Sequence, residues 1–147
     1  MPCSVRFETV YKAGEVTAVS YTAGKEISRD TLVTTGEPAA VRIALDKGSI
    51  RTDGHDLVYA SVEIVDSEGR VVPDAEVSIK AGVSGAGYLA GFGSANPVTE
   101  EDYTDDEAVT YRGRAMAIVR SGYEAGTLQL EVTSETLGSA SADFSVI

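Results

Sequence analysis

The chain has 147 residues, of which 43% are hydrophobic and 24% charged, enough for the core of one ordinary domain or of one domain with part of another. Its formal net charge of −11 argues against nucleic acid and anionic membranes as partners, because both require clustered Lys and Arg. Acidity of this kind is typical of a well-solvated surface, with cation binding as the functional alternative.

A single cysteine, Cys3, excludes a disulfide within the chain, and we expect it to pack or to be exposed rather than to react. No run approaches the roughly 18 consecutive apolar residues of a membrane-spanning helix. The opening segment MPCSVRFETVY lacks the apolar stretch of a signal peptide, so we expect none within this chain. The cellular compartment is left open by these observations.

The first part of the chain alternates apolar and polar residues with a period of two. This pattern predicts three strands, over residues 5–11, 15–21 and 25–34, separated by glycine-containing turns. Residues 35–38, TGEP, have the composition of a short linker. Because three strands cannot cover their own apolar face, we expect residues 1–37 to be a partial β-sheet domain.

The rest of the chain, residues 38–147, is predicted to be an all-β domain, an immunoglobulin-like Greek-key β-sandwich. No segment has the spacing of a long helix, and turn residues recur between short alternating runs. About seven strands are expected, in the order typical of such a sandwich. They cover residues 40–45, 57–65, 76–81, 109–111, 115–120, 127–133 and 140–147.

The clearest pattern lies between residues 57 and 81. Val62 and Ile64 belong to a β-branched run, and residues 66–69, DSEG, supply turn chemistry after it. A second strand should begin at Val71 and be interrupted by Pro73, which cannot donate to a sheet ladder. Strict alternation then resumes through Val77 and Ile79, so we expect a hairpin that buries these four apolar side chains.

Several ordered motifs in this region carry a family resemblance. They are DGHDLVYASVEIVDSEGRVVPDAEVSI, GAGYLAGFGSANPVTEEDYTD and YRGRAMAIVRSG. With them, residues 38–147 resemble the C-terminal immunoglobulin-like domain of large glycoside hydrolase family 2 enzymes of the β-galactosidase type. Residues 5–36, with VTAVSYTAGKEISRDTLVTTG, resemble the second half of the immunoglobulin-like domain that precedes it in those enzymes.

The resemblance implies a non-catalytic accessory role. In that family the catalytic glutamates lie in an upstream (β/α)8 barrel, and nothing in this chain resembles that barrel. No catalytic, cofactor-binding or metal-binding residue is therefore carried over, and no cofactor is expected. The partners implied are the other domains of the parent enzyme, with a homo-oligomer left open. Two alternatives remain: a carbohydrate-binding module, and an adhesin-type bacterial immunoglobulin-like spacer.

An acidic stretch, TEEDYTDDE at residues 99–107, is the strongest candidate for chemistry. Glycoside hydrolysis needs two carboxylates about 5 to 10 Å apart across the sugar, one of them with a raised pKa. The run is polar, so it offers no apolar surroundings that would raise the pKa of a carboxyl group. It also lacks the spacing of a calcium loop, and we therefore interpret it as a solvated loop. The carboxylates considered are Glu100, Glu101, Asp102, Asp105, Asp106 and Glu107.

Other reactive residue types are isolated. His55 is the only histidine, and no serine lies in a G-x-S-x-G elbow; those considered are Ser84, Ser94 and Ser121. The glycines between Gly85 and Gly93 would suit a phosphate loop only if a helix opened there, and the residues between them are typical of a strand with bulges.

Aromatic residues could form a sugar-binding platform, but there is no tryptophan. Most of the seven tyrosines fall on predicted strands or turns, where packing at the edge of the core accounts for them. Direct carbohydrate binding is therefore kept only as an alternative. The tyrosines are Tyr11, Tyr21, Tyr59, Tyr88, Tyr103, Tyr111 and Tyr123.

Overall fold

The computed structural model describes residues 4–147, so the prediction for Cys3 lies outside the described residues. The contacts divide the chain into two compact units, residues 1–35 and 36–147. All regular elements of the described residues are strands, which confirms the all-β prediction. Residues 4–147 contain no helix long and apolar enough to cross a membrane. Whether the two units fold independently stays a prediction.

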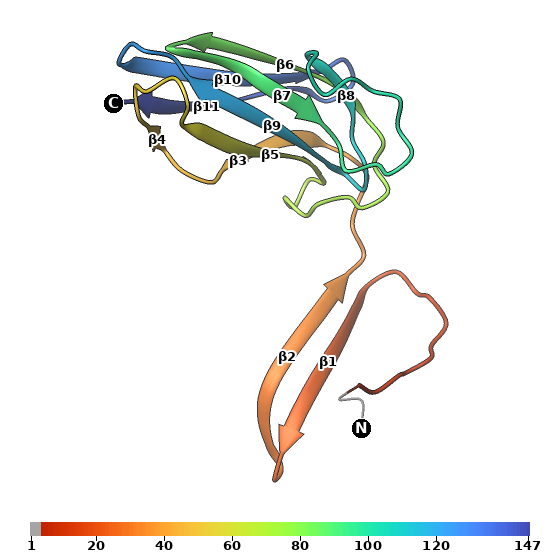
Figure 1. The fold of residues 1–147 in the computed structure, drawn as a ribbon. Helices are drawn as coiled ribbons and strands as arrows, with labels where there is room; N and C mark the ends of the chain where they lie inside the picture. The colour runs from red at the N-terminus through yellow and green to blue at the C-terminus, as the bar shows by residue number, and fades with distance from the viewer. Residues whose placement is uncertain (1–3) are drawn as a thin grey trace. The chain divides into compact units, whose positions relative to one another are not determined.

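The first unit is an antiparallel hairpin of two strands (Figure 1). β1 (Glu15–Thr22) pairs with β2 (Lys25–Val33), so two of the predicted strands are confirmed. Between them, Ala23 and Gly24 have positive φ angles of 51° and 77°. Left-handed conformations at both central positions are those of the type I′ turn that closes a tight hairpin.

The predicted strand over residues 5–11 is wrong, because residues 4–12 carry no strand. Alternation predicts which side chains a strand would bury, but a strand forms only where its backbone groups find a ladder partner. Val5 and Phe7 are 77% and 85% exposed. This segment therefore has neither a pairing strand nor a covering layer within the described residues.

The second unit is a sandwich of two sheets (Figure 1), which confirms the predicted β-sandwich with nine strands in place of about seven. The four-stranded sheet has the order β3-β5-β9-β7, with bounds Ala40–Leu45, Leu57–Val65, Arg114–Ser121 and Gly87–Gly93. The five-stranded sheet has the order β4-β11-β10-β6-β8, with bounds Ser49–Ile50, Gly138–Val146, Gly126–Ser134, Ser78–Gly85 and Glu107–Val109. Only β4 and β11 pair in parallel.

One continuous core fills the space between the two sheets. Alternate residues of the central strands face it, and each is at most 6% exposed. A buried aliphatic side chain of this kind contributes about 1.5–3 kcal/mol. The core residues of three central strands are Val58, Ala60, Val62 and Ile64 of β5, Ala115, Ala117 and Val119 of β9, and Leu128, Leu130 and Val132 of β10.

The segment after β5 differs in part from the prediction. The turn forms, since the Gly69 N–H donates to the Asp66 carbonyl at 3.0 Å, but only one bridge, Val65 to Val71, follows it. The chain then crosses over, and β6 pairs with β10 and β8 instead of β5. Pro73 offers no N–H to extend the hairpin.

Two smaller expectations in this region are also wrong. Val77 is half-buried rather than buried, with its N–H donating to the Thr110 hydroxyl at 2.9 Å. The strand expected over residues 109–111 is instead β8, which ends at Val109. Burial of Val62, Ile64 and Ile79 is confirmed.

The Asp66 carboxylate organises the entry of the chain into the sandwich. Its side chain is fully buried, and its Oδ2 accepts the Gly36 N–H at 2.9 Å and the Arg70 Nε–H at 2.8 Å. Its Oδ1 accepts the N–H groups of Glu68 and Arg70 at 3.0 and 2.9 Å. The bond from Gly36, followed by those from Arg70, holds the pKa of the Asp66 carboxyl far below its usual range.

Ile64→Ala should lower the free energy of unfolding by about 2–5 kcal/mol, because it deletes buried methyl groups from a close-packed core. Ile64 is 0% exposed, whereas Ile147 in the same unit is 69% exposed. Ile147→Ala is thus the matched control, expected to change stability by less than about 0.5 kcal/mol. Urea denaturation of both variants checks this, and equal losses would contradict the assignment of the inward face.

Asp66→Asn should reduce stability at neutral pH and flatten its dependence on acid. The folded chain keeps Asp66 ionised well below the pH at which the unfolded chain protonates it, so its contribution is present above about pH 4 and is lost as pH falls. The urea midpoints of the parent chain and the variant should therefore converge between about pH 5 and pH 2. Parallel pH profiles for the two proteins would contradict this role.

Candidate functional site

In the acidic loop, residues 99–107, two carboxylates accept hydrogen bonds from nearby backbone N–H groups. Asp102 Oδ1 accepts both the N–H and the hydroxyl of Thr104 at 2.8 Å, and the N–H bond, with the hydroxyl after it, lowers the pKa of Asp102. Glu101 Oε1 accepts the Val109 N–H at 2.8 Å. A general acid requires a raised pKa, so a lowered one suits a turn and not an acid catalyst.

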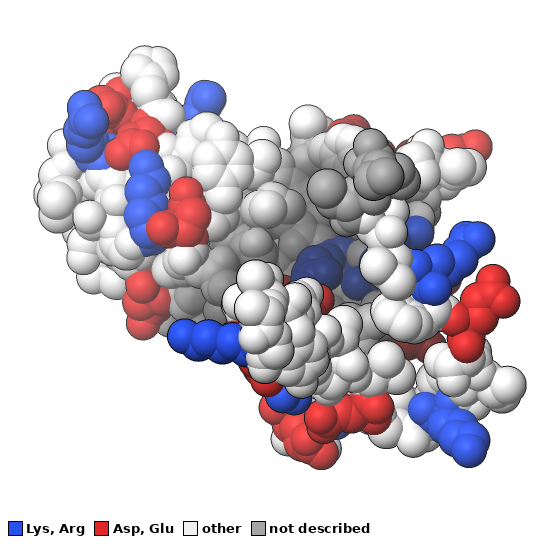
Figure 2. Space-filling model, turned by 90° about the horizontal axis from the view of Figure 1, so that it is seen from below, with Lys and Arg blue, Asp and Glu red and all other residues white. Residues whose placement is uncertain are grey.

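The remaining loop acids are exposed, and two of them, Asp106 and Glu107, face a lysine, whereas Asp105 Oδ1 accepts the Glu107 N–H at 3.2 Å. Lys80 Nζ lies 3.2 Å from Asp106 Oδ2 and 3.1 Å from Glu107 Oε1. Within residues 4–147, no group of three His, Cys, Asp or Glu side chains is placed to hold a metal ion. On the face shown in Figure 2, acidic and basic side chains are interspersed rather than gathered in one patch. That no residue is catalytic stays a prediction.

His55 and the candidate serines do not form a catalytic arrangement. His55 is exposed in a turn where its N–H donates to Asp53 Oδ1 at 2.8 Å. Ser121 lies nearby, since its N–H donates to the Asp56 carbonyl at 3.0 Å, but its side chain is 0% exposed and faces the core. Ser84 is exposed on β6, and Ser94 is buried on the loop after β7.

The glycine-rich segment forms a strand, as the spacing predicts. Gly87–Gly93 is β7, and its register with β9 shifts between Leu89 and Gly91, which marks a bulge. No helix opens at these glycines. Gly93 instead allows a close approach, because a Cβ there would lie 2.1 Å from Cδ1 of Tyr103.

An apolar depression of about 380 Å³, called here the outer hollow, lies on the outward face of the four-stranded sheet. The register places Met116 of β9 between Ser61 and Gly93, and Ile118 next to Gly91. The small residues Ser61, Gly91 and Gly93 beside these two large side chains leave a recess. The hollow is lined by Ser61, Gly91, Phe92, Gly93, Ser94, Ala95, Tyr103, Tyr111, Arg114, Ala115, Met116 and Ile118.

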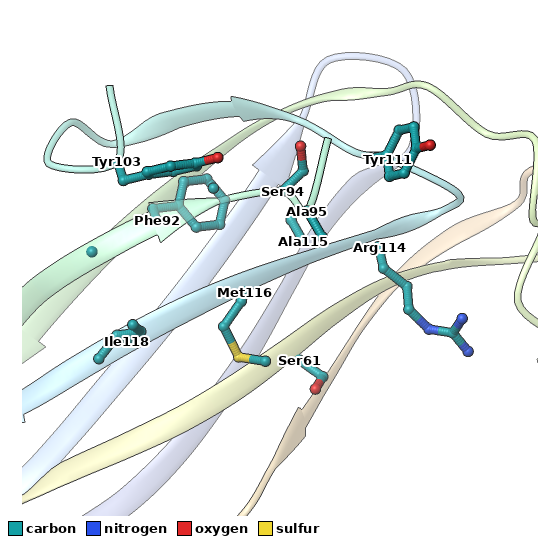
Figure 3. A pocket seen from close by; sticks show the side chains of 12 residues that line it. Ser61, Phe92, Ser94, Ala95, Tyr103, Tyr111, Arg114, Ala115, Met116 and Ile118 are labelled. Carbon is teal, nitrogen blue, oxygen red and sulfur yellow. The ribbon is translucent and has the colours of Figure 1, made fainter. Parts of the chain in front are cut away.

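Two tyrosines bound the hollow, and each has one ring face occupied. Figure 3 shows Met116 and Ile118 on β9, with Tyr103 and Tyr111 to the two sides of Ser94. The Tyr103 ring lies against Gly93, and the backbone carbonyl of Tyr103 accepts the Phe92 N–H at 2.9 Å. The Arg112 guanidinium lies 5.6 Å from the centre of the Tyr111 ring. The acidic loop is thereby anchored to the sheet.

The charged side chain at the rim of the outer hollow, Arg114, is held in an ion pair. Arg114 Nε lies 3.2 Å from Glu63 Oε1, and Arg42 donates to Glu63 Oε2 at 2.6 and 3.0 Å. Burial raises the pKa of Glu63, but the bonds from the two arginines outweigh it and the net shift is downward. The outer hollow therefore offers mainly apolar contact area, and the Arg114 charge at its rim is paired with Glu63.

Other tyrosines are likewise held by the sandwich. The Tyr88 hydroxyl accepts a 3.4 Å bond from Arg120, and a Cβ at Gly54 would lie 2.4 Å from the ring of Tyr123. Sequence reasoning missed the hollow, although one signal was present. The run AMAIV at residues 115–119 is apolar on both faces of its strand, which is typical of a strand covered on both sides.

Comparison with known proteins gives a consistent result. Residues 41–143 match the family model described as glycoside hydrolase family 2 C-terminal domain 5. A β-galactosidase from Bacteroides ovatus is 29% identical over 136 residues, covering 92% of this chain and 16% of that protein. A β-glucuronidase from Formosa agariphila is 32% identical over 130 residues, covering 85% of this chain and 13% of that protein.

A solved structure agrees with these relatives. A glycosyl hydrolase family 2 member from Bacteroides cellulosilyticus superposes with a TM-score of 0.91 at 32% identity. The match covers 93% of this chain and 18% of that one. The chain thus spans about a sixth of the length of the relatives that it matches.

Gly93→Ala should displace the Tyr103 ring and destabilise the fold by about 1–3 kcal/mol, the usual cost of overpacking. Gly82→Ala on β6 is the matched control, because a Cβ at Gly82 has no atom within 4 Å. Urea denaturation and the ring resonances of Tyr103 measure both effects. Unchanged Tyr103 resonances in the Gly93 variant would contradict the packing described here.

Proposed function

Because this chain belongs to glycoside hydrolase family 2, as a C-terminal domain of that family, we propose that it is a non-catalytic accessory domain of a longer enzyme. The parent would be a glycosidase of the β-galactosidase type, with its catalytic carboxylates in a part of the polypeptide outside this chain. The observation that carries the proposal is the family match over residues 41–143, together with relatives about six times longer.

The chemistry of the described residues supports a structural role. The carboxylates of Asp66, Asp102 and Glu101 accept backbone N–H groups, and Glu63 is held by two arginines. The pKa values of Asp66, Asp102 and Glu63 are lowered, whereas a general acid needs a raised pKa. The domain would instead pack against its neighbours in the parent enzyme and steady them, and the outer hollow supplies an apolar surface suited to such packing.

The two alternatives have less support. A carbohydrate-binding module needs an aromatic platform, and the sequence holds no tryptophan for one, while the Tyr103 ring packs against Gly93. An adhesin-type spacer would not account for the match to a family 2 C-terminal domain. Both remain distinguishable by the experiment below.

The purified 147-residue chain should show no turnover of chromogenic β-galactosides or β-glucuronides, because in the proposed parent the catalytic acid and nucleophile lie outside this chain. The full-length parent is the positive control and should hydrolyse at least one of these substrates. Turnover by the chain that survives repurification and is lost in Glu101→Gln would overturn the proposal. Binding of sugar without turnover, followed by calorimetry, would favour the carbohydrate-binding alternative.

A further inference from the structure

A buried carboxylate of the sandwich holds the segment that leads into it. The Asp66 side chain is fully buried, and its two oxygens accept hydrogen bonds from the N–H groups of Gly36, Glu68 and Arg70 and from the Arg70 Nε–H. An ionised carboxylate has about four lone-pair sites, so these donors fill all of them. Glu68 and Arg70 belong to the turn that follows Asp66, whereas Gly36 comes from a distant part of the chain. The bond from Gly36 therefore ties this segment to the turn.

The bond between Gly36 and Asp66 is built to persist. The Gly36 N–H donates to Asp66 Oδ2 at 2.9 Å, and a hydrogen bond to an ionised acceptor is about twice as strong as one between neutral groups. Because the carboxylate is buried, water cannot easily replace the donor. The backbone of Gly36 also packs on Asp66, since a Cβ at Gly36 would lie 3.5 Å from the Asp66 Cβ. Gly36 is therefore fixed to the sandwich, and the division of the contacts after residue 35 agrees.

The residues after Gly36 have little freedom either. The Ala39 N–H donates to the Val65 carbonyl at 2.8 Å, so only Glu37 and Pro38 lie between two anchored residues. Pro38 fixes its own φ angle and confines Glu37 to an extended conformation. Residues 36–39 are thus held by the sandwich, although TGEP at residues 35–38 has the composition of a linker.

On the other side, the ladder of the first unit continues to Thr34. The Thr34 N–H donates to the Gly14 carbonyl at 2.8 Å, and the Gly14 N–H donates to the Thr34 hydroxyl at 3.0 Å. Within residues 4–147, no hydrogen bond reaches Thr35. One residue has only two soft backbone dihedral angles and spans at most about 3.6 Å. The segment that neither unit holds is therefore a single residue, Thr35.

We propose that Thr35 is a one-residue joint between the sandwich and the chain before it, and that Asp66 is the positioning residue that keeps this joint short. With the bond from Gly36 in place, the sandwich can turn only about Thr35. Without that bond, residues 35–38 become one free segment, because the next anchored residue is Ala39. A carboxylate inside the sandwich thus limits the orientations that the sandwich can take relative to the preceding chain. This joint lies within the 147 residues and does not depend on the proposed function.

NMR relaxation of the backbone amides in the 147-residue chain tests the joint without any substitution. The order parameters of Gly36 and Ala39 should match those of the sandwich strands, about 0.85, whereas that of Thr35 should be lower. The Gly36 amide should also exchange with solvent about tenfold more slowly than the Thr35 amide, because its N–H is bonded to a buried acceptor. Equal order parameters at Thr35 and Gly36, whether both high or both low, would overturn the proposal.

Asp66→Ala and Asp102→Ala form a matched pair, because each removes a carboxylate that accepts backbone N–H groups, but only Asp66 accepts one from Gly36. In Asp66→Ala, the order parameters of Gly36 and Glu37 should fall to that of Thr35, while Ala39 keeps its value through its bond to Val65. Asp102→Ala should change none of them. An Asp66→Ala variant that is less stable but keeps Gly36 ordered would overturn the proposal. If that variant does not fold, the comparison of Thr35 and Gly36 in the unsubstituted chain decides alone.

Discussion

The sandwich depends on burying one face of each sheet against the other. Val62 and Ile64 of β5, and Val119 of β9, are 0% exposed, and so is Leu130 of β10 from the opposite sheet. Because side chains alternate across a strand, fixing the inward set fixes the outward set as well. The outward positions of β9 then include Met116 and Ile118, and the small residues Ser61, Gly91 and Gly93 on the neighbouring strands leave the outer hollow beside them.

Acidic side chains stabilise the loops through hydrogen bonds, whereas aliphatic side chains stabilise the core through burial. Asp66, Asp56 and Asp53 each accept backbone N–H groups in turns that join strands. The pKa of Asp56 is lowered to about 2, first by its bond from Lys47 and then by the Arg51 N–H. The lowered pKa values of Asp56 and Asp66 suit carboxylates that hold turns, whereas a general acid needs a raised pKa.

Local patterns predicted most of the sandwich because its strands alternate cleanly and end at turn residues. They could not predict which sheet a strand joins: β6 leaves β5 for β10, since Pro73 stops the first hairpin and the core accepts Ile79 from the other side. The two-residue strand β4 has no period to detect. The strand predicted over residues 5–11 is wrong for the opposite reason. The alternation there is clear, but no ladder partner lies among the described residues.

The family was accessible from ordered motifs, whereas the outer hollow was not. The hollow requires the register of three strands and the fold of a distant loop that brings Tyr103 onto Gly93. These are properties of pairing in space, and single-sequence periodicity does not contain them.

Both sheets and the core between them lie within residues 36–147, so we expect this part of the chain to fold without the hairpin. Urea unfolding of residues 36–147, compared with the whole chain, tests it most directly. Starting at Gly36 retains its bond to Asp66. We expect one cooperative transition with the same urea midpoint in both proteins. The dependence of the unfolding free energy on urea concentration should differ little between them, because the hairpin buries little surface. An unfolded or markedly less stable 36–147 fragment would contradict it.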